Sequence, residues 1–241
     1  MTAIGVHQGL ASSFEEIVAT NARLGGFSNT NMYPSQAEGT RVAGQAERLG
    51  NVAIDAAAVR RGDRALLTEL GGAATSVANT SGRLAVMANQ GTTFGDWRNA
   101  LAGPVDAVRA GLAAQPGTAR PARSANDLIA GFGGAIEDLS RSNGLLHAYS
   151  NRDIYPTASM GDTGRRVARE VSDLAIDLTL LDPNAAPTAR QIMDGARKIG
   201  SNAGRMAIMA NSGTTFASWS GAYDDALRAL QDGLQLAAKI R

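Results

Sequence analysis

The chain contains one stretch of sequence twice. Residues 84–97 read L-A-V-M-A-N-Q-G-T-T-F-G-D-W, and residues 206–219, each 122 positions later, read M-A-I-M-A-N-S-G-T-T-F-A-S-W. The same offset aligns residues 53–55 with 175–177 and Tyr33-Pro34 with Tyr155-Pro156. Self-similarity without insertions predicts a tandem duplication of one folding unit. We therefore expect two homologous domains, residues 1–117 and 118–241.

The spacing of apolar residues predicts that both units are helical. Apolar residues recur at helical intervals between turn signals, and no region shows a sustained strand-like alternation. The expected fold class is all-α, with two tandem four-helix bundles joined by a linker at 115–123. Capping patterns and glycines give the expected helices: Ser12 to Gly25, Ser35 to Arg60, Asp63 to Asn89 with a bend or break at Gly71-Gly72, Thr93 to Leu112, Ser124 to Leu146, Thr157 to Leu181, Thr188 to Asn211 and Thr215 to Ile240.

The repeated G-T-T-F-x-x-W motif has a structural interpretation. Its glycine can take the left-handed conformation that ends one helix, its second threonine can cap the next helix, and its two aromatic residues share one buried face. An anion site at the exposed helix N-terminus is the functional alternative. The residues of this predicted structural corner are Gly91, Thr93, Phe94 and Trp97 in the first half and Gly213, Thr215, Phe216 and Trp219 in the second.

Several polar residues also recur at the same offset. Asp55 and Arg83 have the counterparts Asp177 and Arg205. Because each Asp and Arg is expected on adjacent helices among apolar residues, we interpret them as buried ion pairs, Asp55–Arg83 and Asp177–Arg205. In the alternative interpretation, Arg83 and Arg205 face a ligand or a nucleic acid.

Composition narrows the classes of function. The net charge of +1 excludes a general polycationic role, and the absence of cysteine excludes disulfides, thiolate metal sites and cysteine nucleophiles. The basic residues are 21 arginines with only Lys198 and Lys239, and arginine favours bidentate contacts to phosphate or carboxylate. With no signal peptide and no apolar run long enough for a membrane span, we expect a soluble protein, intracellular at synthesis.

No catalytic constellation is present in the sequence. His7 and His147 are the only histidines and are not counterparts of each other, and the zinc-protease, di-iron-bundle and serine-hydrolase motifs are missing. We therefore expect a protein that is not an enzyme and has no cofactor and no metal site.

The segment F-E-E-I-V-A-T-N-A-R-L-G-G-F…E-G-T-R-V-A-G-Q-A-E-R-L at 14–49 resembles the first helical hairpin of tobamovirus-type coat proteins. The G-T-T-F-x-x-W motif is similar to the aromatic segment after their last helix. The resemblance covers about a third of each repeat, and the duplication departs from that single-bundle family. It implies assembly into a rod, a place in the virion, and contacts to the RNA or DNA backbone through Arg41, Arg83, Arg165, Arg166 and Arg205.

Two hypotheses follow. In the first, the chain is a self-assembling structural protein, the coat subunit of a filamentous or rod-like particle whose partners are further copies of itself and a nucleic acid. In the second, it is a soluble helical binding module that holds a small ligand or a partner between its two repeats.

Overall fold

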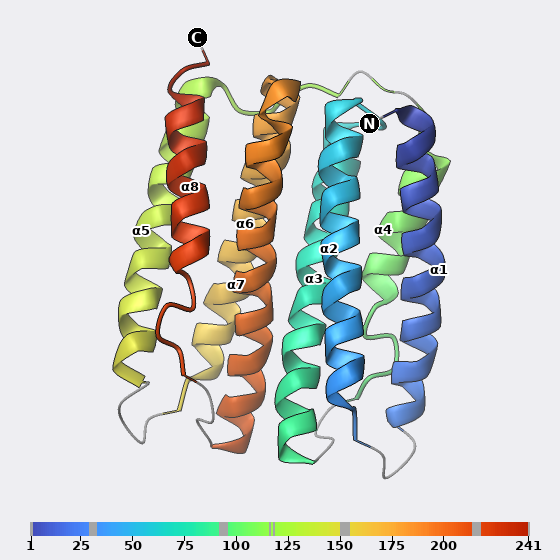
Figure 1. Ribbon diagram of the computed structural model, residues 1–241, viewed down its shortest axis with the longest axis vertical. Helices are drawn as coiled ribbons and strands as arrows, with labels where there is room; N and C mark the ends of the chain where they lie inside the picture. The colour runs from blue at the N-terminus through green and yellow to red at the C-terminus, as the bar shows by residue number, and fades with distance from the viewer. Residues whose placement is uncertain are drawn as a thin grey trace.

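The computed structural model is all-α, and the residues that it describes contain no β-strand. These are residues 2–28, 33–91, 96–115, 117, 119–149, 155–213 and 218–240. The helices lie along one long axis, with both chain termini at the same end (Figure 1). They are α1 (Ala3–Phe27), α2 (Gln36–Ala58), α3 (Arg64–Gln90), α4 (Ala102–Ala113), α5 (Ala125–Tyr149), α6 (Ala158–Leu181), the short 3-10 helix η1 (Pro183–Ala185), α7 (Ala186–Ser212) and α8 (Asp224–Ala237).

The helices pack as two rings that share a long contact. In the first ring α1 to α4 each pack against two neighbours, and α5 to α8 do the same in the second. The helices α2 and α3 also pack against α6 and α7 in the middle of the molecule (Figure 1). One hydrophobic core therefore runs through both rings. The division into two domains, 1–117 and 118–241, stays a prediction.

The contact between α3 and α7 brings backbone against backbone. A Cβ atom on Gly82 would lie 1.9 Å from the carbonyl oxygen of Ser201, and one on Gly204 would lie 2.0 Å from that of Asn79. Ser201 and Gly204 are the counterparts of Asn79 and Gly82 at the 122-residue offset, so the contact is nearly symmetrical. Only glycine allows helices to approach this closely at these points.

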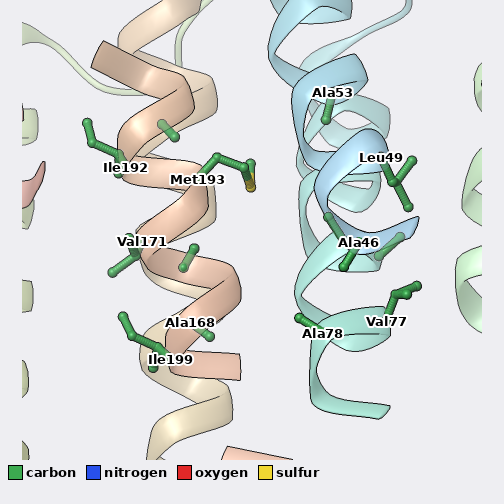
Figure 2. Close-up of a cluster of buried hydrophobic side chains, with 14 of the residues drawn as sticks. Ala46, Leu49, Ala53, Val77, Ala78, Ala168, Val171, Ile192, Met193 and Ile199 are labelled. Atoms are coloured by element: carbon green, nitrogen blue, oxygen red, sulfur yellow. The ribbon is translucent and has the colours of Figure 1, made fainter. Parts of the chain in front are cut away.

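Side-chain size follows this geometry. Ala78 and Ala168 point into the space between the two halves, whereas Leu49 and Val77 point away from it into the outer part of the first ring (Figure 2). Met193 is a large side chain that extends from α7 toward the first half, among the small residues of this contact (Figure 2). Small residues thus bring the halves together, and branched residues fill the core of each ring.

Most predicted helix ends are confirmed. The side-chain oxygens of Ser35, Asp63 and Thr157 each accept a hydrogen bond from the amide three residues on, as expected of N-caps. Gly91 and Gly213 end α3 and α7 in the left-handed conformation, with φ of 60° and 62°.

The expected start of the first helix at Ser12 is wrong. The helix α1 begins at Ala3, and the Thr2 hydroxyl accepts from the amide of Gly5 at 3.2 Å. The capping-box pattern at Ser12 lies inside the helix because Val6 and Leu10 extend the buried stripe upstream at helical spacing.

Of the bend or break expected at Gly71-Gly72, the break is wrong, because α3 runs unbroken through these residues, and the bend stays a prediction. The glycines instead admit side chains from the other half. A Cβ on Gly71 would lie 2.4 Å from Ser172 Oγ, and one on Gly72 would lie 1.7 Å from a terminal nitrogen of Arg169.

The last helix of each half begins later than expected. The expected caps Thr93 and Thr215 lie, with Phe94 and Phe216, outside the described residues. Trp97 and Trp219 precede helices that begin only at Ala102 and Asp224. Asn99 and Gly221, which are counterparts, have φ of 59° and 70°. A right-handed helix cannot include these conformations, so both helices start after them.

Candidate anion site between the two halves

Each half holds an arginine against its buried tryptophan. The guanidinium carbon of Arg83 lies 4.6 Å from the ring centroid of Trp97, and that of Arg205 lies 4.9 Å from Trp219. Both tryptophans are fully buried. The Ser28 hydroxyl accepts from the backbone amide of Trp97 at 2.8 Å, which fixes this residue ahead of α4. The stacking places both guanidinium groups beside their helices and limits their movement.

Arg83 reaches a groove where the two halves meet. The groove has a volume of about 220 Å³ and lies between α3 and α6, and Gly200 of α7 also lines it. Arg165 and Arg169 of α6 line it from the second half. Arg169 crosses α3 at Gly72, where any side chain would collide with its guanidinium group. The remaining polar lining comes from Thr75, Ser76, Asn79 and Thr80 of α3.

The three arginines differ in their partners. Arg169 pairs with Glu69 at 2.8 Å and with Asp173 at 3.5 Å, and Arg165 pairs with Asp162. Among the described residues, Arg83 has no carboxylate partner. Burial and the nearby positive charge of Arg165 lower the pKa of Arg83 below the usual arginine value. The groove therefore contains a half-buried cation that the described part of the protein does not neutralise.

The corresponding groove of the second half has a different character. At the offset of 122, Arg165 and Arg169 correspond to Ala43 and Glu47 of α2. Lys198 and Arg197 of α7 are paired there, both with Asp194, at 3.0 and 2.7 Å. A larger open pocket of about 540 Å³ lies beside them and mixes both charges. The α3–α6 groove is distinguished by three arginines on one lining, of which Arg83 has no carboxylate partner among the described residues.

The structure brings only two of the five predicted arginines together. Arg83 and Arg165 line the α3–α6 groove, and Arg205 does not. Arg41 pairs with Glu38 on α2. Arg166 does not line the groove and lies 2.9 Å from Asp138 and 3.6 Å from Glu170.

Sequence reasoning missed Arg169 as a member of the site. Arg169 follows Arg165 by four residues, and this spacing predicts that both lie on one face of a helix. That spacing is the sequence signal by which Arg169 could have been included. The part played by Gly72 depends on a contact between halves and has no sequence signature.

The predicted pairs Asp55–Arg83 and Asp177–Arg205 are wrong. Asp55 pairs with Arg190, and Asp177 accepts two hydrogen bonds from Arg64 at 2.7 and 2.8 Å. Because α2 and α3 are antiparallel, Asp55 at the end of α2 lies near the start of α3. Arg83 is 19 residues farther along α3, about 29 Å away at 1.5 Å per residue. Each carboxylate is bound instead by an arginine of the other half.

The described residues contain no group of three or more His, Cys, Asp or Glu side chains arranged to hold a metal ion. No helix in the described part is long and apolar enough to cross a membrane. No protein-family model, curated protein or solved structure matches the chain.

Proposed function

We propose that this chain is a non-enzymatic helical binding protein that holds the phosphate groups of an anionic ligand in the α3–α6 groove between its two halves. The observation that supports this function is the convergence of Arg83, Arg165 and Arg169 on one groove, where no carboxylate of the described residues pairs with Arg83. Guanidinium groups bind phosphate oxygens through paired N–H donors. Such charge-assisted hydrogen bonds are stronger than hydrogen bonds between neutral groups.

The energetics of Arg83 favour a bound anion. A guanidinium that is half withdrawn from water loses solvation, and its stacking on Trp97 returns only about 0.5–2 kcal/mol. The repulsion between Arg83 and Arg165 adds to the cost. An anion between them attracts both guanidinium groups and so offsets their repulsion.

The size of the groove limits how much of the ligand can enter. A volume of about 220 Å³ is smaller than typical pockets for whole drug-sized molecules, which span roughly 300–1,000 Å³. We therefore expect one or two phosphate groups to enter, while the rest of the ligand stays outside.

Calorimetric titration with pyrophosphate tests this function. We expect Arg83→Gln and Arg165→Gln each to weaken binding by roughly 10- to 100-fold, because a hydrogen bond to a charged group contributes about 1.5–3 kcal/mol. Arg166→Gln is the matched control, since Arg166 is adjacent in sequence but lines a different pocket. Equal loss in all three variants, or no saturable binding to the wild type, would contradict the proposal.

A second candidate is the coat subunit of a filamentous particle. It is favoured by the two arginines, Arg83 and Arg205, that stack on tryptophan at equivalent positions and have no carboxylate partner among the described residues. A polymer of the chain would then carry regularly repeated phosphate contacts. Electron microscopy of the purified protein distinguishes the candidates, because the coat requires filaments or tubes with nuclease-protected nucleic acid, and the binding protein requires small discrete particles.

A further inference from the structure

A separate cavity, open to solvent, lies between α5 and α6 in the second ring of helices. It has a volume of about 330 Å³, which lies in the range of small-molecule pockets. Leu146, Met160, Met206 and Tyr223 supply its apolar surface, and Thr163 is among the polar residues that line it. Methionine side chains adapt to differently shaped apolar partners. The cavity does not share a residue with the α3–α6 groove.

Tyr223 supplies a polar group in this apolar surface. Its side chain is 1% exposed, and no described residue forms a hydrogen bond with its hydroxyl group. A tyrosine hydroxyl is protonated and able to donate at neutral pH, and burial raises the pKa of Tyr223 further above its ordinary value. Because Tyr223 lines the cavity, a ligand with an acceptor atom can accept a hydrogen bond from this hydroxyl.

The first half has an ion-paired cluster at the equivalent position. Met160 and Thr163 correspond to Glu38 and Arg41, and Leu145 corresponds to Arg23. Glu38 is buried and is held by both arginines, at 3.3 Å from Arg23. In the second half this ion-paired cluster is replaced by uncharged side chains beside a cavity.

The charges at the rim determine the kind of ligand. Arg141 pairs with Glu137 at 2.9 Å, and Arg166 pairs with Asp138 at 2.9 Å, so the rim offers no excess charge. Burying a charged ligand without a counter-ion is strongly unfavourable. We propose that this cavity binds a small neutral molecule that has an apolar body and one hydrogen-bond-accepting oxygen, to which the Tyr223 hydroxyl donates.

Two probes of nearly equal shape test the site. Acetophenone carries a carbonyl oxygen, and ethylbenzene lacks it. Dissociation constants for the full chain are measured by ligand-observed NMR. We expect the wild type to bind acetophenone roughly five- to tenfold more tightly than ethylbenzene, the effect of one net hydrogen bond. Tyr223→Phe should remove this difference and leave the binding of ethylbenzene unchanged.

Variants that fill the cavity locate the binding. Thr163→Trp should abolish binding of both probes, whereas Ser140→Trp, at an exposed position of α5 that does not line the cavity, should leave both unchanged. Ser142→Phe is a second filling variant if Thr163→Trp fails to fold. If a variant with a filled cavity folds and still binds the probes, the cavity is not the binding site. An unchanged preference for acetophenone in Tyr223→Phe, or no saturable binding of either probe to the wild type, would overturn the proposal as well.

Discussion

At the scale of single residues, the most constrained polar groups join the two halves. The carboxylate of Asp177 is fully buried and bound by Arg64 and by Arg123, whose Nε lies 3.5 Å away. Asp55 is nearly as buried and is bound by Arg190. Such pairs add little net stability, but removing one partner leaves an uncompensated charge. Their placement fixes how the halves meet.

Removing the Asp177 carboxylate should therefore destabilise the protein. We expect Asp177→Ala to lower the free energy of unfolding by about 3 kcal/mol, the lower end for a broken buried pair because Arg64 and Arg123 are partly exposed. Asp106→Ala, which breaks an exposed pair with Arg109, should change it by less than about 0.5 kcal/mol. Urea denaturation measures both. Equal effects would show that Asp177 is no more important than a surface carboxylate.

The sequence indicated which carboxylates matter, but not what binds them. Asp55 and Asp177 stand out because they recur at the 122-residue offset within apolar segments. Arg190 and Arg64, which bind them, come from the other half, and nothing in the local pattern encodes that packing. The same limit applies to the groove, where Arg83 and Arg165 were predicted as phosphate contacts but their proximity was not.

At the scale of helices, sequence signals worked where the interaction is local. The N-caps at Ser35, Asp63 and Thr157 were predicted correctly. Each depends on a hydrogen bond between its side chain and the backbone amide three residues later. The late starts of α4 and α8 depend on left-handed residues at Asn99 and Gly221, and Asn gives only a weak signal for that conformation.

The parallel helices α3 and α7 depend on two glycines. We expect Gly82→Ala and Gly204→Ala each to lower the free energy of unfolding by about 1–3 kcal/mol. In each variant the added Cβ meets a backbone carbonyl oxygen that cannot rotate away. The double variant should lose less unfolding free energy than the two single variants together, because one separation of the helices relieves both clashes. Thermal and urea unfolding measure these losses.

Gly133 provides the control for this prediction. It is exposed on α5, and a Cβ there would have no neighbour within 4 Å. Gly133→Ala should stabilise the protein by about 0.5–1 kcal/mol, because alanine favours the helix. If Gly82→Ala also stabilised, the close approach of α3 and α7 would be incorrect.

At the scale of the whole molecule, the proposed anion site exists only where the halves meet. Arg83 comes from α3, while Arg165 and Arg169 come from α6, and Gly72 provides the space for Arg169. Neither half contains the set alone. The two halves also differ in detail, since the corresponding groove holds Glu47 in place of Arg169. A pair of similar bundles thus acquires one groove with unbalanced positive charge.

The most direct test of this account is a crystal structure of the full chain grown with tungstate, an anion that can replace phosphate and has a strong anomalous signal. The account predicts an anomalous peak between the guanidinium groups of Arg83 and Arg165, with no comparable peak at Arg205. A peak only at Arg205, or tungstate scattered over exposed arginines with none in the α3–α6 groove, would contradict it.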